Sequence, residues 1–189
     1  MIRIGILGDI GSGKSYVANS FGCPVFNADH EVSKLYKKEQ RIFKKLKKKL
    51  PKHISSFPIN KSEITKAILS NKVNLKKIIT IVHLEIRKIL KLFLKKNRNK
   101  KVIILDIPLL LENKINNKDD ILVFVESKKI EIEKRLKKRL NFNRKLINKF
   151  KKIQFSSSYK KRRSNFIIKN NFKKKSLNKS IKKILNEIL

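Results

Sequence analysis

The chain has 189 residues, 40% of them hydrophobic, which is enough for one core with a small insertion but not for two independent domains. Its 50 lysine and arginine residues face only 14 acidic residues, which gives a formal net charge of +36. A single cysteine, Cys23, excludes an intrachain disulfide and a multi-cysteine zinc site. The apolar stretches fall far short of the ~18 residues of a membrane-spanning helix, and Met1 begins a strand pattern, so we expect a cytoplasmic protein without a membrane partner.

The positive charge makes nucleic acid the first partner to consider. The lysines, however, recur from Lys34 to Lys183 rather than gathering on one element, and the chain has no tryptophan. Basic and aromatic residues do not alternate as base-stacking surfaces require. We therefore expect no specific nucleic-acid partner, only non-specific and salt-sensitive binding to polyanions.

Five short apolar runs predict buried strands, separated by helical patterns. They are residues 2–7, 24–27, 102–106, 121–126 and 166–168. Strands that alternate with helices indicate a parallel sheet. The predicted fold class is therefore α/β, with a doubly wound P-loop core of about five parallel strands, a helical substrate-binding insertion and a helical lid.

The first strand leads directly into the pattern G-x-x-x-x-G-K-S at residues 8–15. A glycine-rich turn between a strand and a helix directs backbone NH groups into one concavity, which suits a polyphosphate. Lys14 can reach the β- and γ-phosphates, and the Ser15 hydroxyl can bind Mg²⁺. The pattern predicts an ATP site, in which we also place Gly11, Ser12, Gly13 and Tyr16.

Two aspartates follow predicted strands, at the sheet edge where ligands of doubly wound folds bind. Asp29 comes just after the second strand and is our candidate base for an attacking hydroxyl; the alternative is that it caps the helix that follows. Asp106 ends the third strand and can hold Mg²⁺ through a water molecule.

Helical periodicity fills residues 30–97, which is too long for one crossover, so we expect a helical excursion over the sheet edge. After the fourth strand, Ser127 can cap a helix running to about Leu140, and a second helix is expected over residues 144–155. Arg135, Arg139 and Arg144 lie there and can close over a triphosphate, or can simply be surface charges. Apolar residues from 177 to 188 predict a final amphipathic helix.

Together these motifs resemble the dephospho-CoA kinase family along nearly the whole chain. The residues that carry the resemblance are 10–15, 27–29, His83, 108–112, Arg139, Arg144, Gln154 and the pair Asn170-Asn171. The resemblance implies transfer of the γ-phosphoryl group of ATP to the ribose 3′-hydroxyl of dephospho-CoA, with Mg²⁺. It gives Asp29 the role of base and places His83 at the substrate.

The resemblance also implies three parts in what we expect to be a monomer. They are a nucleotide-binding core (1–29, 98–127 and 156–189), a CoA-binding insertion (30–97) and a lid (128–155). Three residues depart from the family pattern, namely Tyr16, Asn27 and Leu84. Leu84 stands where proline is typical, so a purely structural role for His83 stays open.

Three other functions compete with this interpretation. A GTP-driven switch would explain the N-K-x-D pattern at residues 117–120, but here the pattern precedes a strand and no glycine follows Gly22. A nucleic-acid-stimulated ATPase would explain the charge. A P-loop kinase for another small metabolite would share the core and differ in the insertion.

Overall fold

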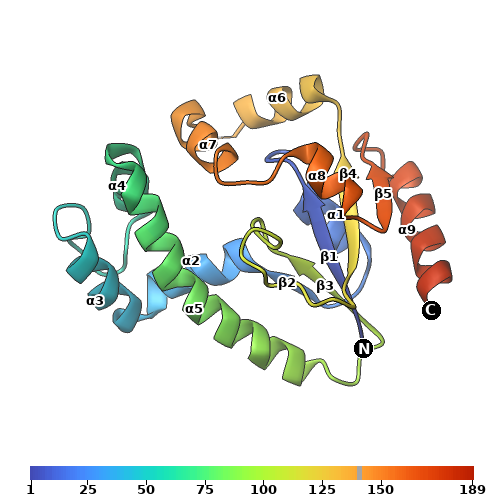
Figure 1. The fold of residues 1–189 in the computed structure, drawn as a ribbon, viewed down its shortest axis with the longest axis horizontal. Coiled ribbons are helices and arrows are strands. Elements are labelled where there is room, and N and C mark those ends of the chain that lie inside the picture. The colour runs from blue at the N-terminus through green and yellow to red at the C-terminus, as the bar shows by residue number, and fades with distance from the viewer. Residues whose placement is uncertain (140–141) are drawn as a thin grey trace. The chain divides into compact units, whose positions relative to one another are not determined.

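The computed structural model describes residues 1–139 and 142–189, which form two compact units (Figure 1). The core unit comprises Met1–Asn27, Asn97–Phe142 and Ile153–Leu189, and the helical unit comprises Ala28–Lys96 and Asn143–Lys152. The two helices expected in a lid belong to different units, α6 (Lys129–Lys137) to the core unit and α7 (Arg144–Lys151) to the helical unit. The division into core, insertion and lid stays a prediction.

The core unit is built on a parallel five-stranded sheet within the described residues. Its strands are β1 (Ile2–Gly8), β2 (Val25–Asn27), β3 (Val102–Asp106), β4 (Ile121–Glu126) and β5 (Phe166–Lys169). They lie in the order β2-β3-β1-β4-β5, with every neighbouring pair parallel. This sheet confirms the predicted fold class. The strands could be recognised in the sequence because strands that are buried on both faces are apolar throughout.

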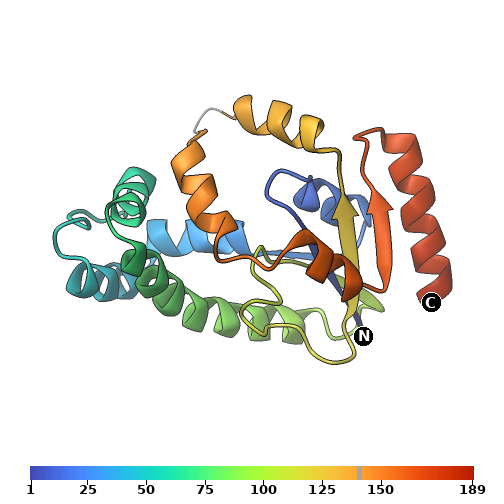
Figure 2. The ribbon, with the colours of Figure 1, turned by 45° about the horizontal axis from the view of Figure 1, so that its top comes forward.

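One face of the sheet carries the main hydrophobic core. Alternate residues of the central strands, among them Ile4, Ile6 and Ile104, pack with residues of α1 (Lys14–Ser20) and α9 (Lys174–Ile188). Leu177 and Ile181 provide part of the apolar stripe of α9, as the helical spacing predicted. Figures 1 and 2 show α9 running beside β5 at the edge of the sheet.

The other face is covered by the turn after β3 and by α8 (Ser157–Arg162), which contacts β1 and lies in front of the strands in Figure 1. Leu110 of this turn lies against Gly5 of β1. A Cβ atom at Gly5 would lie 2.5 Å from Leu110 Cδ2 and 2.9 Å from Leu122 Cδ2. The turn therefore packs directly against the backbone of β1, in space that any larger side chain at residue 5 would fill.

The helical unit consists of α7 and four helices that follow β2. These are α2 (Ala28–Lys38), α3 (Gln40–Lys49), α4 (Lys61–Ser70) and α5 (Lys72–Lys96). Lys149 of α7 donates hydrogen bonds from Nζ to the carbonyl oxygens of Ile68, at 2.6 Å, and Leu69, at 3.0 Å. A cation at the carboxyl end of α4 compensates carbonyls that lack helical partners.

A buried carboxylate joins α3 to α5 inside the helical unit. The Glu85 side chain is only 5% exposed, and it pairs with Arg41 at 2.9 Å, Lys45 at 3.5 Å and Lys88 at 3.3 Å. Burial tends to raise the pKa of Glu85, but the hydrogen bond from Lys88 and the three positive charges outweigh it and leave the pKa below its ordinary value. The carboxylate is thus held ionised among cations.

Two expectations about helix ends in this part of the chain are wrong. Helix α6 has Lys128, not Ser127, at its N-cap, and it ends at Lys137; residue 140, to which the prediction extended, lies outside the described residues. Helix α7 ends at Lys151 rather than near residue 155. Propensity and spacing locate a helix well but place its ends poorly.

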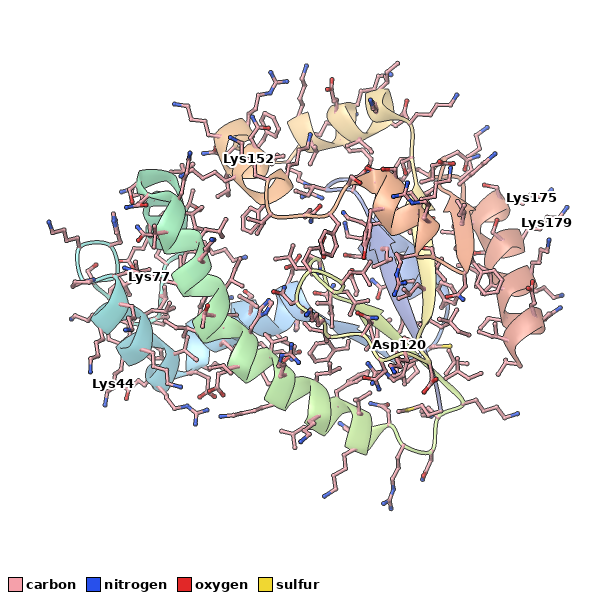
Figure 3. All side chains as sticks on the ribbon, viewed as in Figure 1. Lys44, Lys77, Asp120, Lys152, Lys175 and Lys179 are labelled. Carbon is pink, nitrogen blue, oxygen red and sulfur yellow. The ribbon has the colours of Figure 1, made fainter. Side chains whose placement is uncertain are left out.

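Most of the lysines stand on the surface, as Figure 3 shows for Lys44, Lys77, Lys152, Lys175 and Lys179, all of them exposed. Asp120 of the N-K-x-D pattern is instead buried and binds the Arg3 guanidinium at 2.9 Å. It also accepts a hydrogen bond from the backbone NH of Asn117. The aspartate therefore closes a turn before β4, which gives the pattern a structural explanation. No helix in the described residues has the length and apolar character of a membrane span.

Candidate active site

The predicted phosphate loop connects the end of β1 at Gly8 to the start of α1 at Lys14. Gly13 stands at the N-cap of α1 with φ 89° and ψ 26°, in the left-handed region that favours glycine. A Cβ atom here would lie 2.5 Å from Asn170 Nδ2 and 2.8 Å from Phe172 Cε1. The loop is therefore closely packed on the segment that follows β5.

The carbonyl oxygen of Ser12 is fixed from the ends of two strands. Asn170 Nδ2 donates to it at 2.9 Å, and Ser127 Oγ donates to it at 2.9 Å. Ser127 Oγ also contacts the carbonyl oxygen of Asn170 at 3.2 Å. This network explains why Ser127 does not cap α6, because its hydroxyl is committed to the phosphate loop.

Lys14 crosses its own loop. Its Nζ donates to the carbonyl oxygens of Gly8 at 3.2 Å and Asp9 at 2.8 Å. The Asp9 carbonyl oxygen also accepts a hydrogen bond from the backbone NH of Ser12 at 3.1 Å. The side chain is thus held over the turn by two main-chain acceptors, and its charge also acts on the Asp106 carboxylate.

Asp106 lies at the end of β3, opposite Asn27 of β2 in the strand register. It is 3% exposed, and its Oδ2 accepts a hydrogen bond of 2.6 Å from Asn27 Nδ2. Burial raises the pKa of Asp106, against the opposing effects of a hydrogen bond with Ser15, the charge of Lys14 and the hydrogen bond from Asn27. Asn27, a departure from the family pattern, therefore has a definite role as a donor to this carboxylate.

Ser15 and Asp106 form a donor set that fits Mg²⁺. This ion prefers oxygen ligands and usually takes one or two carboxylates, with substrate phosphates and water completing its shell. Within the described residues there is no group of three or more histidine, cysteine, aspartate and glutamate side chains that would hold a metal unaided. The chemistry of this pair suits an ion that arrives with a nucleotide.

The predicted lid arginines in the core unit differ in their surroundings. The Arg135 guanidinium lies 3.9 Å from the centre of the Phe172 ring, the same ring that approaches Gly13. A cation over an aromatic face is an attractive arrangement. Arg139 follows α6 with an exposed side chain, so it is available to a ligand.

Three further predicted site residues lie on separate helices of the helical unit. Asp29 is exposed in the first turn of α2, which begins at Ala28, so the alternative that it forms the N-cap is wrong. Arg144 begins α7, whose N-cap Asn143 accepts a hydrogen bond from Leu146 NH. His83 is half-buried in α5, where burial, followed by the charge of Arg87, lowers its pKa. A histidine with a lowered pKa is neutral at pH 7.

Sequence reasoning missed two residues beside the phosphate loop. Ser157 Oγ donates to both carboxylate oxygens of Asp9, at 2.7 and 2.8 Å. Lys160 is 3% exposed, and its Nζ lies 3.4 Å from the Gly8 carbonyl oxygen. Neither residue belongs to a motif, and a buried lysine cannot be distinguished by sequence among so many solvated ones.

Comparison with known proteins agrees with this geometry. The sequence model of the dephospho-CoA kinase family matches residues 2–176. The chain is 32% identical over 190 residues to a dephospho-CoA kinase of Wolbachia pipientis wMel, covering 98% of this chain and 97% of that protein. It is 31% identical over 170 residues to a dephospho-CoA kinase of Bartonella henselae, covering 87% of each.

Solved structures share the fold. TT1252 from Thermus thermophilus superposes with a TM-score of 0.77 at 24% identity, covering 100% of this chain and 98% of that one. A dephospho-CoA kinase from Campylobacter jejuni gives 0.60 at 21% identity, covering 98% and 96%. The sequence match spans nearly the whole chain, and we conclude that this chain belongs to the dephospho-CoA kinase family.

Proposed function

We propose that this chain transfers the γ-phosphoryl group of ATP to the ribose 3′-hydroxyl of dephospho-CoA, which yields coenzyme A. The observation that carries the proposal is the grouping of Lys14, Ser15 and Asp106 at the carboxyl ends of the central strands, in a chain of this kinase family. Phosphoryl transfer needs little covalent chemistry from the protein and depends on positioning and on stabilisation of charge. The residues of the core unit supply both.

The phosphate loop would bind the triphosphate through backbone NH groups at the start of α1, where the helix dipole favours negative charge. Lys14 would exchange its contacts with the Gly8 and Asp9 carbonyl oxygens for the β- and γ-phosphates. Gly11, Ser12 and Tyr16 belong to the same proposed site. Arg139 and Arg144 are proposed to neutralise the charge that develops during transfer.

Mg²⁺ would be held by the Ser15 hydroxyl and, through water, by Asp106. When bound, the ion neutralises charge on the β- and γ-phosphate oxygens. Asn27 and Ser15 both donate hydrogen bonds to Asp106 and so favour its ionised form against the effect of burial. The protein thereby keeps a carboxylate ready in a largely buried position.

Asp29 is the proposed general base. The acceptor oxygen attacks the γ-phosphorus while the bond from that phosphorus to the β-γ bridging oxygen breaks, so that ADP leaves and the hydroxyl proton passes to the Asp29 carboxylate. Asp29 is exposed in the first turn of α2, at the start of the helix that follows β2. His83, neutral at pH 7, is proposed to contact the substrate.

A mass-spectrometric assay with several acceptors tests the proposal. Purified protein with ATP and Mg²⁺ should convert dephospho-CoA to CoA, Lys14→Ala should abolish the reaction, and Asp29→Asn should slow turnover more than it weakens ATP binding. Asp119→Asn is the matched control, since Asp119 is an exposed aspartate outside the proposed site. Phosphorylation of shikimate, a nucleoside or pantothenate without any reaction of dephospho-CoA would overturn the substrate assignment.

Three properties of the protein in solution remain proposals. We expect a cytoplasmic monomer whose ATP turnover is indifferent to added RNA or DNA. Size-exclusion chromatography with light scattering measures the oligomeric state. A strong, salt-dependent stimulation of hydrolysis by polynucleotide would favour the ATPase alternative instead.

A further inference from the structure

Lys160 of α8 is buried in a chain whose lysines are otherwise mostly solvated. Its Nζ donates to Gln154 Oε1 at 3.1 Å and to the Gly8 carbonyl oxygen at 3.4 Å, and lies 3.9 Å from Asp9 Oδ1. Burying an ammonium group is costly unless its hydrogen bonds and charge are compensated. The partners of Lys160 must therefore provide this compensation.

The partners of Lys160 connect three separate segments of the core unit. Gln154 Nε2 donates to the Pro108 carbonyl oxygen at 3.4 Å, and the backbone NH of Phe155 donates to Glu112 Oε1 at 2.8 Å. Burial lowers the pKa of Lys160, and the charges of Glu112 and Asp9 oppose that change. The ammonium group thus lies between the phosphate loop and the turn that follows β3.

Each carbonyl oxygen that Lys14 contacts has a second hydrogen-bond donor. Gly8 accepts from Lys160 in addition to Lys14, and Asp9 accepts from the backbone NH of Ser12 in addition to Lys14. If Lys14 turns toward phosphate, both carbonyl oxygens keep a donor. The second donor matters because a buried carbonyl left without a hydrogen bond costs free energy.

We propose that Lys160 is a positioning residue for nucleotide binding, which keeps the Gly8 carbonyl oxygen hydrogen-bonded when Lys14 leaves it for the phosphates. Lys160 itself does not touch the nucleotide. It lowers the cost of moving Lys14 and holds the first turn of the phosphate loop in one conformation. The inference rests on the proposed role of Lys14 in the preceding section.

Binding of ADP, measured by isothermal titration calorimetry, tests this inference. Lys160→Met removes the donor but retains a long side chain, and we expect about tenfold weaker ADP binding, the loss typical of one hydrogen bond to a charged group. Lys161→Met is the matched control, because Lys161 is the next residue of the same helix and pairs with Glu126 at the surface. It should bind ADP as the wild type does.

Repeating the substitution in a Lys14→Met background separates positioning from a general structural effect. Without Lys14, the Gly8 carbonyl oxygen loses no donor on nucleotide binding, so the effect of Lys160→Met should shrink by about tenfold. The removal of positive charge acts equally in both backgrounds and cancels in the comparison. An undiminished effect in the Lys14→Met background would overturn the inference.

Two further results have a defined meaning. Unchanged ADP binding by folded Lys160→Met would also refute the positioning role, whereas failure of the wild type to bind ADP at all would refute the proposed function instead. Far-UV circular dichroism establishes folding. If Lys160→Met does not fold, the same comparison is made with Lys160→Gln, whose side chain is shorter, polar and uncharged.

Discussion

Substitution of Gly13 by alanine is the sharpest test of how the phosphate loop is held. The added methyl group would stand 2.5 Å from Asn170 Nδ2, which donates a hydrogen bond to the Ser12 carbonyl oxygen at 2.9 Å. Either the amide or the loop must move. Both movements break the contact that joins the loop to the end of β5.

The expected cost has two sources. The left-handed backbone at φ 89° costs an alanine about 1–2 kcal/mol. Loss of the buried hydrogen bond between Asn170 and Ser12 adds about 1–3 kcal/mol. We therefore expect Gly13→Ala to lower the free energy of unfolding by about 2–5 kcal/mol and to weaken ADP binding.

Gly22→Ala provides the matched control. Gly22 has φ 67°, and no heavy atom lies within 4 Å of its added Cβ, so only the backbone cost of about 1–2 kcal/mol applies. Urea-induced unfolding followed by circular dichroism measures both variants, and calorimetry with ADP gives the effect on binding. Equal destabilisation by the two substitutions, with ADP affinity intact, would refute the argument from packing.

Three further predictions concern single side chains. Asp106→Asn should raise the Mg²⁺ concentration needed for half-maximal turnover without lowering thermal stability, because burial raises the pKa of Asp106 and its charge opposes folding; a stability loss would contradict this. Glu85→Gln should lower the free energy of unfolding by about 1–3 kcal/mol at pH 7. Since the pKa of Glu85 is lowered from 4.5 on folding, that difference should disappear in urea titrations as the pH falls below this value, and a pH-independent cost would argue against the charge cluster. Ser127→Ala should raise the KM for ATP in steady-state assays by a few-fold while helix content is unchanged, whereas a loss of helix would restore the capping role.

The sheet was predictable because its strands are buried on both faces, so that runs such as residues 102–106 are apolar without interruption. The phosphate loop was predictable because its glycines and Lys14 stand at fixed spacings. The prediction that Ser127 caps a helix was wrong, because its hydroxyl donates to the carbonyl oxygens of Ser12 and Asn170, which lie far away in the sequence. Lys160 could not be identified from the sequence, because it differs from the other lysines in its burial and not in its residue type.

The close approach of Leu110 to Gly5 has a consequence for genetics. A methyl group at residue 5 would force the side chain of Leu110 to shift. Leu110 belongs to the segment whose Pro108 and Glu112 contact Gln154 and Phe155, and Lys160 links that segment to the start of the phosphate loop. A screen for loss of function would therefore score this mid-strand position together with the nucleotide-binding residues. The phenotype would arise because Gly5 has no side chain and the space beside it is filled by Leu110 and Leu122.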